Sequence, residues 1–398
     1  MLPEYYEFYN PVKIISGLKA LDAIPFELQQ FAAQRPMLIT DPGVSKAGLL
    51  NPVLRGFAGS GLSLGVVFDK VPPDSSLNTV QQAAELYREH ACDALLAVGG
   101  GSVIDTAKGL NICITHNSVD LKPFAGANRL SRPLQPLLVV PTTAGTGSEV
   151  TSVALVSDED QQMKMTFSSP FLLPRVAVLD PRMLQTLPPL ATAATGMDAL
   201  THAIEAFTCL QKNPLSDAYA WAALELISGN LLPSVRKGRD TRSRLAMANA
   251  ATMAGIAFSN SMVGLVHSLG HAAGSVCRIP HGVAMAIFLH SVLQYNLPRI
   301  KHELGRLLLP LSGDRAMAGL EPEERARRVL DWVRDLQEEL HALCRLPRTL
   351  EEAGATRDQL GAIARKAVND GSLIFNPEDV SFDDALDLAK QAFTTGQS

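Results

Sequence analysis

Two short apolar runs of this chain end directly in loops of very small residues. The run at 95–98 leads into three glycines at 99–101, and the run LLVV leads into PTTAGTGSE at 141–149. A buried strand that turns through glycine into a segment with helical spacing is typical of layered α/β folds with a parallel sheet. Similar runs, such as PMLITDPG and VAVLDP, recur up to about residue 187. We therefore predict an α/β nucleotide-binding domain with a variant doubly wound, largely parallel sheet over residues 1–187.

The second half of the chain has a different character. After paired prolines at 188 and 189, long segments rich in Ala, Leu and Met show helical spacing, among them ATAATGMDALTHAIEAF and RSRLAMANAATMAGIAFS. The chain of 398 residues also exceeds what one hydrophobic core usually serves, which favours two domains. We predict that residues 188–398 form an all-helical domain.

Charge and cysteine content disfavour several classes of protein. The formal net charge of -5 leaves no basic stripe for nucleic acid and no polybasic segment for a membrane. The five cysteines include no C-x-x-C pair, which argues against both a disulfide framework and a thiolate zinc site. The N-terminus lacks a basic segment followed by an apolar run, and no later apolar stretch has transmembrane length. We expect a cytoplasmic protein that acts on a small molecule.

The two small-residue loops fit a nucleotide cofactor. Glycines let the backbone approach a ligand, and a helix that starts at Ser102 would offer free amides and its positive dipole end to a diphosphate. The hydroxyl groups of the second loop can donate to phosphate or ribose oxygens, although they could instead cap their own helix. The candidate residues are Gly99, Gly100, Gly101, Ser102, Thr142, Thr143, Thr146 and Ser148.

Asp41 follows the apolar run MLIT and is a candidate ligand of an adenosine ribose. A carboxylate can accept hydrogen bonds from both ribose hydroxyls and would repel a 2′-phosphate, which favours NAD over NADP. In the usual dinucleotide fingerprint the glycines precede the acid by about 20 residues. Here Asp41 precedes Gly99, so we expect the sheet to be a variant of the usual fold.

Five potential metal ligands gather in the helical half. Asp198 and His202 are four residues apart, as are His267 and His271, and His281 follows a predicted helix break. A spacing of four places two side chains on one helix face, so two helices could present donors to one ion. Three imidazoles with one carboxylate suit Fe(II), Zn(II) or Co(II). A zinc peptidase is disfavoured because its motif has glutamate after the first histidine, where this chain has serine.

These residues together resemble the iron-containing, group III alcohol dehydrogenase family. The resemblance rests on GGGSxxD at 99–105, PTTAGTGSEVT at 141–151, GMDALTHAIEA at 196–206, and HSLGH to PHG at 267–282. It implies an NAD-dependent oxidoreductase that interconverts a small alcohol and its aldehyde or ketone by hydride transfer. It also implies Fe(II), with Zn(II) as the alternative, and a two-domain plan related to that of dehydroquinate synthase.

The resemblance further implies roles for single residues. His271 would lie beside the nicotinamide, as the catalytic candidate, rather than on the metal. The implied metal ligands are Asp198, His202, His267 and His281. The implied cofactor contacts add Asp105 and Lys164 to Asp41 and the two loops. We expect a homodimer or a larger homo-oligomer.

Three other functions stay open on the sequence alone. The segment PDSS at 73–76 is similar to the hydroxyacid-oxoacid transhydrogenase branch of the family, which would pass hydride between acids on a bound cofactor. A lyase resembling dehydroquinate synthase would use NAD and a metal too, but it should have more charged groups in its pocket. A nucleotide-binding sensor would explain the loops and leave the donor cluster unused.

Overall fold

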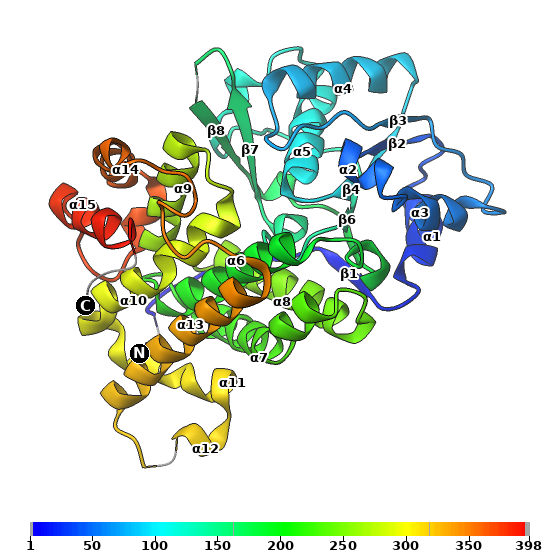
Figure 1. The fold of residues 1–398 in the computed structure, drawn as a ribbon. Coiled ribbons are helices and arrows are strands. Elements are labelled where there is room, and N and C mark those ends of the chain that lie inside the picture. Colours follow the sequence, from blue (N-terminus) through cyan, green and yellow to red (C-terminus); the bar gives the residue numbers. More distant parts are fainter. Residues whose placement is uncertain (1–2, 162, 318, 395–398) are drawn as a thin grey trace. The chain divides into compact units, whose positions relative to one another are not determined.

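The computed structural model describes residues 3–161, 163–317 and 319–394. Its contacts divide the chain into two compact units, Asn10–Leu187 and Pro188–Ser398, and the N-terminal residues up to Tyr9 belong to the second unit. There Phe8 stacks on Tyr219 with ring centroids 5.7 Å apart, and the amide of Tyr9 donates to Asn260. Figure 1 shows strands with helices in the first unit and helices in the second. The predicted fold class is confirmed.

A six-stranded parallel sheet forms the centre of the first unit. Its strands follow the order β1 (Lys13–Ser16), β9 (Val176–Leu179), β6 (Leu137–Pro141), β4 (Ala94–Gly99), β2 (Pro36–Ile39) and β3 (Val66–Phe68). All neighbouring pairs run parallel. In the usual dinucleotide fold the first strand lies at the centre of the sheet, whereas here β1 lies at an edge. The predicted variation from the usual strand order is therefore present.

Alternate residues of each central strand face two separate hydrophobic cores. On β4, Leu95 and Ala97 pack with helices α4 (Leu77–Glu89) and α5 (Gly101–Thr115). Leu96 of the same strand packs on the opposite face, with helices α1 (Ile24–Gln30) and α3 (Leu50–Phe57). Because helices cover both faces of a parallel sheet, its strands are apolar throughout rather than alternating with polar residues. That covering explains the apolar runs of the sequence.

The rest of the first unit consists of a small sheet and short helices. The small sheet has the order β5 (Gly126–Ala127), β8 (Met163–Ser168) and β7 (Val153–Asp158), with β7 and β8 antiparallel. Helix α2 (Pro42–Lys46) follows β2 after two residues, Thr40 and Asp41.

Helix α6 (Pro189–Thr208) lies at the centre of the second unit. It packs against α7 (Pro214–Arg236), α8 (Thr241–Ser259) and α10 (His281–Arg306). Nearly all of its residues after the first turn are buried. The remaining helices are α9 (Leu265–Cys277), α11 (Leu308–Ser312), α12 (Asp314–Met317), α13 (Pro322–Cys344), α14 (Leu360–Ala367) and α15 (Phe382–Gln391). Within the described ranges, no helix combines the length and the apolar character needed to cross a lipid bilayer.

The start of α10 packs closely on α6 because a glycine follows its first residue. A Cβ atom at Gly282 would lie 2.2 Å from the carbonyl oxygen of Ala194 on α6, far inside van der Waals contact. The chain reaches this point after α9 ends at Cys277 and Arg278 adopts a left-handed conformation, with Pro280 as the N-cap of α10. The break predicted before His281 is therefore present, and His281 begins the new helix against α6.

Candidate metal centre and cofactor loops

Four potential metal ligands converge within the helical unit. Asp198 and His202 come from α6, His267 from α9, and His281 is the first residue of α10. Each side chain offers one donor atom, and the four atoms all lie within 4.8 Å of one another. The fold thus gathers four of the five donors that the sequence suggested.

The arrangement of the four side chains is compact and opens on one side. Oδ1 of Asp198 lies 3.2 Å from Nε2 of His281 and 3.6 Å from Nδ1 of His202. Phe258 of α8 stacks on the ring of His202, with centroids 4.2 Å apart, and fixes its plane. The side chain of Asp198 is 2% exposed, whereas that of His281 is 38% exposed. A ligand would therefore reach the group from the side of His281.

The state of the imidazoles fits a divalent cation. Burial lowers the pKa of His202 to about 3 and holds the pKa of His267 well below its ordinary value, so both rings are neutral at pH 7. Neutral imidazole is the form that binds metal. Within the described chain, buried Nδ1 of His202 and buried Nε2 of His267 meet no hydrogen-bond partner, which is costly unless a ligand completes them. One carboxylate with three imidazoles is a donor set that Fe(II) or Zn(II) accepts.

Glu205, which the sequence patterns did not single out, lies directly behind this group. It follows Asp198 by seven residues and His202 by three on α6, so all three share one helix face. Its Oε2 lies 2.5 Å from Nδ1 of His267, and its Oε1 accepts a hydrogen bond from the amide of Val266. Burial raises the pKa of Glu205 to about 7, against the lowering effect of its backbone hydrogen bonds. The helical spacing was the one signal that could have identified it.

His271 stands apart from the four converging donors. Its Nδ1 lies 3.0 Å from Oδ2 of Asp370, and its ring stacks on that of His281 with centroids 5.4 Å apart. Burial opposes the ionisation of Asp370, but the hydrogen bond and charge of His271 lower the pKa of this carboxyl below its ordinary value. Asp370 was also missed, because it lies in the C-terminal hundred residues, where no motif pointed to it.

In the α/β unit, the two small-residue loops lie side by side. Strands β4 and β6 are neighbours, with Gly99 in register with Pro141, and the amide of Thr142 donates to the carbonyl of Gly99. A Cβ atom at Gly101 would lie 3.1 Å from Cγ2 of Thr146, so the loops approach closely. They occupy the carboxyl ends of adjacent parallel strands, where open α/β sheets bind their ligands. The amides of the first turn of α5 begin there too.

Asp41 lies two residues beyond the end of β2, the next strand of the same sheet. It follows β2, which pairs with β4 on the side away from β6. Its Oδ1 accepts hydrogen bonds from the amides of Gly43 and Val44 and so caps α2. Asp41 precedes the glycines in the sequence because β2, which leads to Asp41, comes before β4, which leads to the glycines. The two strands are nevertheless neighbours in the sheet.

Two predicted cofactor residues contact other parts of the α/β unit. The hydroxyl of Ser102 donates to the carbonyl of Pro73, and Oδ2 of Asp105 accepts from the amide of Leu155 at 3.2 Å. These contacts hold α5 against the segment before α4 and against β7. They give both residues a structural task, and their part in cofactor binding stays a prediction.

Three further candidates differ in their surroundings. The amide of buried Ser148 donates to Oγ1 of Thr146 at 3.3 Å, a local turn within the loop, and Gly147 rather than a hydroxyl residue is the N-cap of the short helix Ser148–Val150. Lys164 on β8 instead reaches solvent, with 55% of its side chain exposed, and forms an ion pair of 2.8 Å with Asp74. A lysine in this position remains accessible to an anionic ligand.

Two family models match the chain. The model described as iron-containing alcohol dehydrogenase matches residues 11–181, and the model described as Fe-containing alcohol dehydrogenase family, C-terminal, matches residues 192–393. Together they span both structural units.

Individual relatives agree with the family models. The chain is 32% identical to choline dehydrogenase of Bacillus subtilis (strain 168), over 96% of this chain and 93% of the relative. It is also 32% identical to NAD-dependent methanol dehydrogenase of Bacillus methanolicus, over 97% of this chain and 99% of that relative. A crystal structure of 1,3-propanediol oxidoreductase superposes with a TM-score of 0.93 at 32% identity, covering 98% of this chain and 100% of that one.

Proposed function

Because the chain belongs to the iron-containing alcohol dehydrogenase family, we propose that Asp198, His202, His267 and His281 hold the divalent cation of an NAD-dependent alcohol dehydrogenase. The observation that carries this assignment is the convergence of these four donors, with buried ring nitrogens of His202 and His267 that meet no partner in the described chain. The membership itself makes the chain a metal-dependent oxidoreductase of alcohols. What we propose is which residues bind the metal, the cofactor and the substrate.

The ligand set suits the chemistry of an alcohol. When bound, Fe(II) or Zn(II) supplies a Lewis acid that eases loss of the hydroxyl proton and, in the reverse direction, polarises the carbonyl group. Asp198 contributes one negative charge and the three imidazoles none, so the site keeps a net positive charge for an oxygen that becomes anionic. The exposed edge of His281 leaves one side of the site open to substrate.

His271 is proposed to serve the reaction without binding the ion. Asp370 accepts a hydrogen bond from Nδ1 of this ring, which leaves Nε2 as the nitrogen that can accept a proton. A histidine in this state can take up the proton that the alcohol loses, or contact the nicotinamide ring. Its place beside His281 supports that role.

The α/β unit is proposed to bind NAD at the carboxyl ends of β2, β4 and β6. The glycines of 99–101 and the first amides of α5 suit the diphosphate. Thr142 and Thr143 would donate to cofactor oxygens, Asp41 would accept from the adenosine ribose, and Lys164 would add a positive charge. The adjacency of the two loops supports this assignment.

The substrate is proposed to be a small primary alcohol, with the corresponding aldehyde as product. Choline, methanol and 1,3-propanediol, from which the relatives and the solved structure take their names, all carry a primary hydroxyl group. We also propose a cytoplasmic homodimer or larger homo-oligomer. The cysteines, which are free thiols, support a reducing compartment.

The test is turnover with defined metal and cofactor. Protein reconstituted with Fe(II) without air, or with Zn(II), should form NADH from a panel of primary alcohols when NAD is added. A transhydrogenase would instead transfer hydride from a hydroxy acid to an oxo acid without added NAD. Transfer between acids with no NADH from any alcohol would overturn the proposal in favour of that branch of the family.

A further inference from the structure

Glu205 and His267 form a buried carboxylate–imidazole pair behind the four proposed ligands. Their side chains are 6% and 3% exposed, and Oε2 of Glu205 lies 2.5 Å from Nδ1 of His267. An imidazole can bind a metal through one nitrogen only when the proton sits on the other. Because the carboxylate accepts the Nδ1 proton, the lone pair of His267 is left on Nε2, which is buried and has no hydrogen-bond partner in the described chain.

Glu205 also holds the backbone of the helix that carries His267. Its Oε1 accepts a hydrogen bond of 2.8 Å from the amide of Val266, and Oδ1 of Asn376 accepts one from the amide of Leu265. A Cβ atom at Gly264 would lie 3.3 Å from Oε1 of Glu205 and 3.0 Å from Oδ1 of Asn376. The first turn of α9 is thus capped by side chains from elsewhere in the chain, and Glu205 fixes ring and backbone together.

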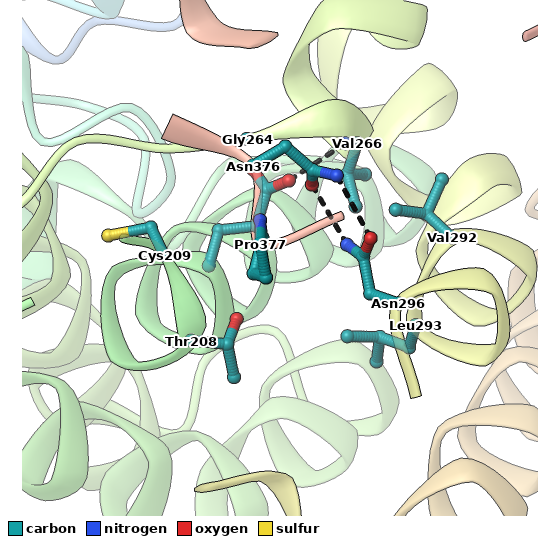
Figure 2. Close-up of a pocket in the computed structure, with 10 residues that line it drawn as sticks. Thr208, Cys209, Gly264, Val266, Val292, Leu293, Asn296, Asn376 and Pro377 are labelled. Atoms are coloured by element: carbon teal, nitrogen blue, oxygen red, sulfur yellow. Dashed lines mark hydrogen bonds between the residues drawn. The ribbon is translucent and has the colours of Figure 1, made fainter. Parts of the chain in front are cut away.

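The surroundings of Glu205 leave its charge to be balanced from the side of the metal ligands. Figure 2 shows the pocket beside it, where Asn296 and Asn376 face each other through paired amide hydrogen bonds. The residues that line this pocket include Thr208 and aliphatic side chains but neither lysine nor arginine. A divalent cation, whose charge Asp198 neutralises only in part, would stabilise the negative charge of Glu205 in a buried environment where unpaired charge is costly.

We propose that Glu205 is a positioning residue of the metal site, which keeps the proton on Nδ1 of His267 and directs Nε2 at the cation. It thereby sets how tightly the site holds its metal. The inference rests on the proposed ligand set, because it acts through His267. Glu205 itself does not contact the ion, and its effect is on the affinity of the site for the metal.

Glu205→Gln provides the sharpest test because it reverses one hydrogen bond while it preserves size. The amide oxygen can still accept from Val266, but the amide nitrogen then faces Nδ1 of His267 and donates to it. That arrangement moves the proton to Nε2, the nitrogen that should bind the ion. Thr208→Val is the matched control, since Thr208 lines the same pocket and its hydroxyl donates to the carbonyl of Ile204, one turn earlier on α6.

The measurement is the Kd for Co(II), by competition with a chelating dye, together with the visible spectrum of the bound Co(II). Glu205→Gln should bind Co(II) about 10- to 100-fold more weakly, with a changed spectrum, while its circular dichroism stays that of the wild type. Thr208→Val should match the wild type. If Glu205→Gln does not fold, Glu205→Asp, whose shorter carboxylate reaches His267 less well, should show the same direction of change.

His267→Ala separates the two claims. Loss of Co(II) binding in His267→Ala, together with wild-type affinity and spectrum in Glu205→Gln, would overturn the role of Glu205 and leave the ligand set intact. Wild-type Co(II) binding in His267→Ala would overturn the ligand set itself, and the role of Glu205 with it.

Discussion

Nε2 of His281 lies 3.2 Å from Oδ1 of Asp198, although the two residues belong to different helices far apart in the sequence. His271, which shares one helix face with His267, meets Asp370 instead. Spacing alone could not choose between these two histidines. Their partners distinguish them, because His281 contacts Asp198 and His271 contacts Asp370. The two histidines therefore lead to distinct expectations for metal binding and for rate.

Asp370→Asn should slow turnover while the protein keeps its metal. The amide of asparagine can donate to Nδ1 of His271 and shift the ring proton to Nε2, which then cannot accept a proton from substrate. We expect kcat/KM to fall at least about 100-fold, the lower end of the range that general acid–base groups contribute. Steady-state kinetics with elemental analysis checks this, and Asp379→Asn, at an exposed position on the same segment, is the control. Unchanged kinetics in Asp370→Asn would remove His271 from the mechanism.

In the metal-free protein, His202 should contribute stability that is lost in acid below about pH 6.5, against the opposite contribution of Glu205, whose pKa is raised. The pKa of His202 is about 6.5 in the unfolded chain and is lowered to about 3 by burial. Between these values the unfolded state binds a proton that the folded state excludes, so the free energy of unfolding falls as pH falls. The slope should approach about 1.4 kcal/mol per pH unit for each such histidine, and His267 shifts in the same direction. Urea unfolding at several pH values measures it, and His202→Asn should have a shallower slope. An equal slope in that variant would contradict the assignment.

Gly282→Ala should destabilise the helical unit and weaken metal binding. Its Cβ would lie 2.2 Å from the carbonyl oxygen of Ala194, so α10 would have to shift from α6 and carry His281 with it. We expect a loss of about 1–3 kcal/mol in the free energy of unfolding. Gly361→Ala is the control, because no atom lies within 4 Å of the added Cβ there. Equal stability of the two variants would show that the contact between α10 and α6 at Gly282 tolerates a side chain.

Asp41→Asn should reduce the preference for NAD over NADP without a loss of stability. Asparagine caps a helix about as well as aspartate does, so the bonds to Gly43 and Val44 can persist while the charge that repels a 2′-phosphate is removed. Asp41→Gly should narrow the preference too. Comparison of kcat/KM for the two cofactors decides it. A wild-type enzyme that already uses both equally well would refute the role of Asp41.

The features of this protein that could be predicted from the sequence are those that the local periodicity of the residues determines. The spacings of four within Asp198–His202 and within His267–His271 indicated helix faces, and the apolar runs before glycine indicated buried parallel strands. The class of each half followed from these patterns. The sheet order did not, because neighbouring strands in space need not be neighbours in the chain.

The residues that were missed depend on contacts between elements. Glu205 acquires its role only because α9 places Val266 and His267 against α6, and Asp370 because the C-terminal segment reaches α9. The helical spacing of Glu205 from His202 was a local signal, but neither of these contacts between elements leaves a pattern in one sequence. The choice between His271 and His281 has the same cause, since it is set by how α10 packs on α6.

The metal content of two purified variants tests the proposed ligand set most directly. His281→Ala should lose bound metal together with activity, because it removes a donor that lies 3.2 Å from Asp198. His271→Ala should retain metal and lose rate or cofactor affinity, because that ring is held by Asp370 outside the converging group. Elemental analysis of both proteins, prepared in parallel, gives the answer. A metal-free His271→Ala protein beside a metal-replete His281→Ala protein would contradict the account.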